Sequence, residues 1–277
     1  MWAIEHPWRP AERSFFAETP APLLGALALA GLGALALVEL HALPEAALGV
    51  AGVAAGQGAL LATALGWAGA GARAGLVAVA LLAIGASAAA LHPVGAVAYA
   101  GVPLWLWWRA RRGAPAALGL AGPVPWGAVW TGLAVGAFLG GHLLISVART
   151  FGVRLRVDAL DLVLAAVAYD LGANVPAAEA FFRGALFDRA QRRWPLGAAV
   201  ALSTAACVTR YMLDPRLPKS VEVIVGAAFY VSLVAAANCW LFRWSGSLLP
   251  GAADALVFFT GYRLLSPPCR SRPASFS

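Results

Sequence analysis

Charged side chains are scarce in this chain. They make up 12% of the 277 residues, about half the share of an ordinary soluble domain, whereas apolar residues make up 61%. This imbalance excludes a soluble enzyme with a normal surface, an intrinsically disordered chain and a collagen-like fibre. The net charge is +7, but the basic residues punctuate apolar runs instead of forming one basic cluster. A nucleic-acid-binding function is therefore excluded too, and we expect no nucleic acid among the partners.

Cysteine and histidine are also rare. The three cysteines, Cys207, Cys239 and Cys269, lie far apart, so the sequence has neither a CxxC pair nor a disulfide framework. Of the four histidines, none follows His142. Because no group of Cys and His residues has the spacing of zinc ligands, we expect neither a metal site nor a cofactor.

Long apolar runs are what the sequence has in quantity. A bilayer core of about 30 Å takes roughly 20 helical residues, so the sequence predicts an all-α, polytopic transmembrane helix bundle that contacts the lipid bilayer, with about eight or nine membrane segments. The half-apolar stretch Pro176–Arg193 is expected to form a short helix. Hydropathy does not show whether this helix spans the membrane, re-enters it or lies at its surface. The expected spans are approximately 22–40, 46–68, 75–91, 94–108, 127–148, 159–174, 196–213, 220–242 and 247–265.

The chain divides into four parts by composition. They are an N-terminal interfacial segment (1–21), N-terminal transmembrane helices (22–125), a core that holds most of the intramembrane polar residues (126–265) and a disordered tail (266–277). Arginines flank alternate spans in the first half, which by the positive-inside rule places the N-terminus in the cytoplasm. Arg149, Arg154 and Arg156 break the alternation, so either 149–158 is interfacial or an earlier span is a hairpin. The excess of Ala, Gly and Arg suggests a GC-rich bacterial genome, hence the bacterial cytoplasmic (inner) membrane.

Ionisable and amide side chains gather in the second half of the chain. Each ionisable group costs about 2.5–3.5 kcal/mol or more at the bilayer centre and normally faces a bundle interior or a wet cavity. Glu179 and Arg183 are four residues apart, which places them on one helical face as an ion pair. The full set is His142, Asp161, Asp170, Asn174, Glu179, Arg183, Asp188, Arg210, Asn238 and Asp254.

The run Glu179–Phe187, E-A-F-F-R-G-A-L-F, resembles the first motif of the CPBP family. These are the CAAX-protease and bacteriocin-processing (Rce1-like) intramembrane glutamic endopeptidases. Their pattern is two adjacent Glu, three mostly apolar residues, Arg and Gly. The second Glu matches Glu179, and the Arg and Gly match Arg183 and Gly184. Ala178 stands where the family has its first Glu, which the resemblance implies is the residue that activates the attacking water.

Two further motifs of that family are matched in position more than in residue type. In the run that begins at Ser203, Cys207 stands at the Phe position and Tyr211 at the His position of the second motif. The entry Ser247-Leu248-Leu249-Pro250 is similar to that of the third motif, and Asp254 and Phe258 lie near its His and Asn positions. The resemblance covers about 127–265 and is compatible with a divergent, myxosortase-like member that handles C-terminal sorting tags.

The resemblance implies an endopeptidase that cuts membrane-anchored proteins near a membrane-proximal C-terminus. Glu179, Arg183, Tyr211 and Asp254 would form its site: Asp254 or Asp170 would assist proton transfer, and Arg183, Tyr211 or Asn174 would polarise the scissile carbonyl. Two alternatives remain open at this point. One is a catalytically inactive pseudoprotease that binds a membrane-anchored partner as a scaffold. The other is a small-molecule or proton transporter with Asp170, Glu179 and Asp254 as a relay, although no internal repeat supports it.

Overall fold

The computed structural model describes residues 16–112, 118–120, 124–151, 160–213 and 221–265. Within these ranges the chain forms helices and contains no β-strand, which confirms the all-α class. The tail 266–277 and most of the interfacial segment 1–21 lie outside the described residues, as do Arg154 and Arg156. The boundaries of the four expected parts therefore stay predictions.

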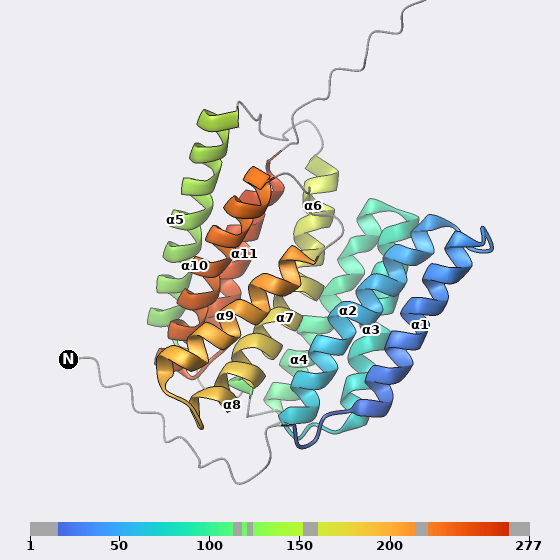
Figure 1. Cartoon of the computed structure of the whole chain (residues 1–277), viewed down its shortest axis with the longest axis horizontal. Helices are drawn as coiled ribbons and strands as arrows, with labels where there is room; N and C mark the ends of the chain where they lie inside the picture. The colour runs from blue at the N-terminus through green and yellow to red at the C-terminus, as the bar shows by residue number, and fades with distance from the viewer. Residues whose placement is uncertain (1–15, 113–117, 121–123, 152–159, 214–220, 266–277) are drawn as a thin grey trace, which may run out of the picture.

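The first half of the chain forms one side of the bundle. Helices α1 (Ala21–Glu39), α2 (Glu45–Trp67) and α3 (Ala72–Leu91) lie side by side, and the short 3₁₀ helix η1 (Pro93–Ala100) leads into α4 (Gly101–Arg111) (Figure 1). Helix α1 is at the edge, and Leu27 is its one buried residue in the described range. Its exposed leucines suit contact with lipid tails, because a helix surrounded by lipid needs no polar face.

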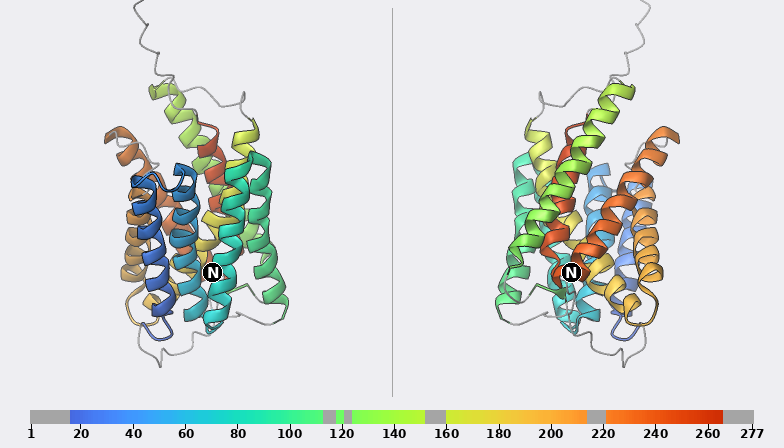
Figure 2. Two further views of the ribbon diagram at one scale, coloured as in Figure 1. Left: turned by 90° about the vertical axis from the view of Figure 1, so that its right-hand side faces the viewer. Right: turned by 90° about the vertical axis from the view of Figure 1, so that its left-hand side faces the viewer.

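The second half surrounds one long helical element. Residues Leu160–Gln191 run without a break through α6 (Leu160–Tyr169), η3 (Asp170–Asn174), α7 (Val175–Ala178), η4 (Glu179–Phe187) and α8 (Asp188–Gln191). Around it pack α9 (Leu196–Met212), α10 (Val221–Ser245) and α11 (Leu249–Arg263). Helix α5 (Trp126–Phe151) packs on α11 and α10, and it crosses in front of α11 in the right-hand view of Figure 2.

The expected break between 159–174 and Pro176–Arg193 does not occur. The stretch η3, which ends two residues before Pro176, is π-helical, so its hydrogen bonds reach five residues instead of four. In a regular α-helix a proline removes one backbone hydrogen bond, and its ring clashes with the carbonyl four residues earlier. The wider π-helical turn gives room for the ring and shifts the register of the backbone hydrogen bonds. The helix thus continues through Pro176, and it carries Glu179 to the middle of the bundle.

Six described helices are long and apolar enough to cross a membrane, so the expected count of eight or nine is not confirmed. The expected span 94–108 is instead η1 followed by the 11-residue helix α4. Helices α9 and α11 have 17 and 15 residues; fifteen residues extend only about 22 Å. The six are Ala21–Glu39, Glu45–Trp67, Ala72–Leu91, Trp126–Thr150, Leu160–Gln191 and Val223–Ser245.

Helices α5 and α11 approach each other closely along a row of glycines. Gly132, Gly136 and Gly140 face Pro250, Asp254 and Phe258 in turn, and a Cβ on either of the first two glycines would collide with the α11 backbone. Small residues four apart allow membrane helices such close contact. The glycine row therefore fixes the depth of α11 and of Asp254.

Contacts between helix termini define one end of the bundle, which we name the basic end. Arg189 Nη2 donates to the carbonyl of Trp67 at 3.0 Å, Arg243 Nη1 donates to Gln191 Oε1 at 3.5 Å, and Gly119 lies against Gly246. The last turn of α4 and the first turn of α5 lie at this same end (Figure 1). Arg149 lies at the opposite end. The described arginines of the basic end are Arg73, Arg109, Arg111, Arg112, Arg189, Arg192, Arg193 and Arg243.

Candidate active site

Glu179 and Arg183 lie on the π-helical stretch η4, in the interior of the bundle. Their side chains are 4% and 2% exposed, and Arg183 Nη1 is 3.4 Å from Glu179 Oε1. The pairing expected from their spacing is therefore present. Ser203 on α9 supports this stretch from the side, because its hydroxyl donates to the carbonyl of Phe182 at 2.8 Å. Neither charge could be buried here without the other, since an isolated ion in an apolar interior is very costly.

Asn238 on α10 belongs to the site, although the sequence alone does not single it out from the other intramembrane polar residues. Its Nδ2 donates to Glu179 Oε1 at 3.0 Å and to the carbonyl of Gly251 at 3.1 Å. Glu179 Oε2 has no hydrogen-bond partner among the described residues and lies against Gly251, where a Cβ would be 2.8 Å away. One carboxylate oxygen is thus fixed and the other is available. The signal in the sequence was an amide side chain inside an apolar run.

A small cavity of about 10 Å³ borders the pair. This is about the space that one buried water molecule needs. Arg183 Nη1 also donates to Cys207 Sγ at 3.4 Å, so the guanidinium connects Glu179 with α9. Three of the four expected site residues, Glu179, Arg183 and Tyr211, meet at this cavity. Its lining is Glu179, Arg183, Cys207, Tyr211, Val231, Val234, Ala255, Phe258 and Phe259.

Asp254, the fourth expected residue, lies beside the cavity without lining it. It has no exposed surface, and neither of its carboxylate oxygens has a hydrogen-bond partner among the described residues. About one turn earlier on the same helix, Gly251 lies against Glu179 Oε2. On its other side, Oδ1 would be 3.0 Å from a Cβ on Gly136. Burial of a carboxyl without a partner is energetically costly, and groups of this kind cluster at functional sites. Asp254 is therefore a candidate for proton transfer.

Tyr211 reaches the cavity from α9 and is held by a chain of polar groups. Its hydroxyl donates to Asn174 Oδ1 at 3.2 Å, and Asn174 Nδ2 donates to Asp170 Oδ1 at 3.0 Å. Arg263 then donates to both oxygens of Asp170, through Nε at 2.8 Å and Nη2 at 2.9 Å. Asp170 is therefore the partner of Arg263 and does not line the cavity with Glu179.

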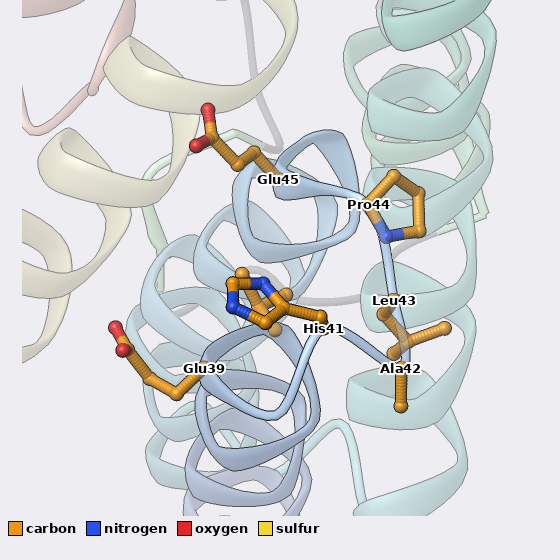
Figure 3. A pocket seen from close by; sticks show the side chains of 7 residues that line it. Glu39, His41, Ala42, Leu43, Pro44 and Glu45 are labelled. Carbon is orange, nitrogen blue, oxygen red and sulfur yellow. The ribbon is translucent and has the colours of Figure 1, made fainter.

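Other polar groups lie apart from this cavity. His142 is exposed, and its Nδ1 is 2.7 Å from the hydroxyl of Tyr230. A wider surface recess of about 510 Å³ lies at the turn between α1 and α2, where Glu39, His41 and Glu45 are all exposed (Figure 3). It has none of the convergent buried polar groups that mark a ligand site. No group of three potential metal-ligating side chains is found within the ranges that the structure describes.

Comparison with known families agrees with the first motif. Residues 159–253 match the family model "Type II CAAX prenyl endopeptidase Rce1-like". The match confirms the resemblance of this stretch to the CPBP family. It contains Glu179, Arg183, Tyr211 and Asn238 and ends one residue before Asp254. No curated protein and no solved structure matches the chain.

Proposed function

We propose that this membrane protein, with its Rce1-like stretch at 159–253, is an intramembrane endopeptidase in which Glu179 is the general base. One observation supports this most directly: a buried carboxylate, held at Oε1 by Asn238 and Arg183, borders a cavity with room for one water molecule. Peptide hydrolysis inside a bilayer needs a water, a base for it and donors for the developing oxyanion.

Each group then has a part in the reaction. Glu179 accepts a proton from the water, the hydroxide attacks the scissile carbonyl carbon, and the negative charge moves to the carbonyl oxygen. Arg183, which borders the same cavity and whose Nε has no partner among the described residues, is a donor for that oxygen. The Tyr211 hydroxyl becomes a second donor once its proton turns away from Asn174 Oδ1. The C–N bond breaks as the proton that Glu179 took up passes to the leaving amine. The buried carboxyl of Asp254, about one turn along α11 from Gly251, supports that transfer. Asn238 positions Glu179 and does not touch the reacting atoms.

Ala178 is the main difference from the family pattern. Its side chain is buried next to Glu179, at the position where the family has its first Glu. Hydrolysis therefore depends on a single motif carboxylate. We expect a slower enzyme than one with two, because mutual repulsion of paired carboxylates raises the pKa of one and readies it to carry a proton.

The substrate class follows from the resemblance and from the depth of the site. We propose that the substrates are membrane-anchored proteins with a C-terminal tag, cut close to the membrane, as in protein sorting. The protein would work in the bacterial inner membrane with its basic end in the cytoplasm, because short loops rich in arginine stay on that side.

The experiment is cleavage of membrane-anchored reporters with different C-terminal tags by the full chain in liposomes. We expect Glu179→Gln to abolish cleavage, because an amide cannot take the proton from water. The matched control is Glu45→Gln, a change of the same chemistry at an exposed position at the opposite end of the bundle from the basic end. Cleavage that survives in Glu179→Gln would show that Glu179 is not the base.

A second candidate function is that of a pseudoprotease that binds such a tag without cutting it. The observation that favours it is Ala178 at the first-Glu position, together with a cavity that admits one water but no peptide. This reading predicts that the native chain cleaves nothing and that Glu179→Gln retains the partner with unchanged affinity. The transporter alternative has less support, because Arg263 engages Asp170, the first member of its relay.

A further inference from the structure

Three tryptophan–arginine stacks occupy the end of α4, at the basic end of the bundle. Each arginine follows its tryptophan by four residues, so both lie on the same face of the helix. The guanidinium carbons of Arg109, Arg111 and Arg112 lie 5.9, 4.3 and 4.0 Å from the ring centroids of Trp105, Trp107 and Trp108 respectively. Trp107 and Trp108 are 55% and 44% exposed, and the two last arginines are exposed as well. We name these six residues the α4 patch.

The arginines of the α4 patch have donors to spare. Within the described ranges, no carboxylate forms an ion pair with any of the three, and Arg109 Nε is buried without a hydrogen-bond partner. Stacking on an indole uses the flat face of a guanidinium and leaves its N–H groups in the ring plane free. That edge matches the two oxygens of a phosphate group.

The position of the α4 patch indicates where a phosphate would come from. Of the 11 tryptophans, Trp2 and Trp8 lie outside the described residues. The remaining nine all lie within about two turns of helix termini at the basic end. Tryptophan rings gather where the bilayer core meets the headgroups, so this end of the bundle lies at that depth. The nine are Trp67, Trp105, Trp107, Trp108, Trp126, Trp130, Trp194, Trp240 and Trp244.

We propose that the α4 patch is a binding site for the phosphate group of an anionic phospholipid in the leaflet at the basic end. The tryptophans set the depth of the helix end, and the arginines meet the headgroup there. Charge complementarity selects an anionic lipid over a zwitterionic one, because the six residues of the α4 patch carry three positive charges and no negative one. This inference is independent of whether the protein cuts peptides.

The test is native mass spectrometry of the full chain after exchange into mixed micelles of phosphatidylglycerol and phosphatidylcholine. We expect preferential retention of phosphatidylglycerol by the native chain and loss of that preference in Arg111→Gln/Arg112→Gln. Each basic residue near an anionic surface contributes a factor of about five in affinity, so the double variant should bind on the order of 25-fold more weakly. Trp107→Leu/Trp108→Leu keeps the charge but removes the stacking, and should weaken binding too.

The matched control is Arg73→Gln/Arg243→Gln, which removes the same charge at the same end of the bundle. Equal loss of phosphatidylglycerol in both arginine variants would mean diffuse attraction to basic charge and would overturn the proposal. Full competition by soluble glycerol phosphate would also overturn it, since the site would then be one for free phosphate. Should a variant not fold, cross-linking of the native chain with a photoreactive phosphatidylglycerol decides the matter. The label must then fall within Gly101–Arg112.

Discussion

The buried pair of Glu179 and Arg183 provides the sharpest test of how the site is held together. Arg183→Met keeps most of the volume of the side chain and removes its charge. Glu179 then keeps its hydrogen bond from Asn238 at 3.0 Å but loses the cation 3.4 Å away. Removal of one partner of a buried ion pair costs about 3–5 kcal/mol. We expect the lower end of that range, about 3 kcal/mol, because the bond from Asn238 remains.

The double variant Glu179→Gln/Arg183→Met separates a true ion pair from simple packing. If the cost of Arg183→Met is the uncompensated charge on Glu179, neutralising that charge should restore part of the stability, by about 1–3 kcal/mol. The double variant should therefore be more stable than Arg183→Met alone. If the two residues only fill space, the double variant should be less stable than either single one.

The assay is thermal unfolding of the purified chain in detergent, which needs no substrate. For a chain of this size, a loss of about 3 kcal/mol lowers the melting temperature by roughly 6–12 °C. The exposed residue Arg73 provides the control, and Arg73→Met should change the melting temperature little. Arg189 is a poorer control, because it bonds and stacks on Trp67. A double variant that melts below Arg183→Met would refute the ion-pair reasoning.

Three further outcomes are expected. Gly136→Ala should destabilise the protein strongly, because its Cβ would meet the backbone and side chain of Asp254, whereas Gly141→Ala meets nothing within 4 Å and should leave the melting temperature unchanged. Tyr211→Phe should lower kcat by about 10²-fold with little change in KM, measured in the liposome cleavage assay; an equal effect on KM would point to substrate binding instead. Ala178→Glu together with Tyr211→His should raise the cleavage rate, because paired carboxylates and an imidazole return to the motif positions; an unchanged rate would mean that these positions do not limit hydrolysis.

Hydropathy and residue spacing predict both the fold class and one of the site contacts. The all-α membrane class follows from apolar runs, and the pair of Glu179 and Arg183 follows from helical spacing within an apolar stretch. The family resemblance over the same motif is confirmed for 159–253. Each of these conclusions depends on residues that are close in sequence, where the geometry of a helix determines which side chains meet.

The remaining site contacts join residues that are far apart in sequence. Asn238 meets Glu179 across 59 positions, and Arg263 meets Asp170 across 93. Periodicity cannot show which of several intramembrane polar groups pair. The sequence therefore allows Asp170 as a proton carrier, whereas in the structure Asp170 is the partner of Arg263. The span count was also uncertain, because hydropathy does not show where a helix ends.

By itself, the sequence determined that this chain belongs in a bilayer, that its helices must bury their few charges, and that Glu179 and Arg183 share a face. Tertiary structure alone decided which oxygen of Glu179 is held, that Tyr211 and not Asp254 borders the cavity, and that nine tryptophans gather at one end. The physical reason is the range of the interactions. Apolar transfer and helical hydrogen bonds act along the chain and leave a local signature, whereas side-chain hydrogen bonds between helices depend on packing, rotation and depth, which are set only once all the helices are in place.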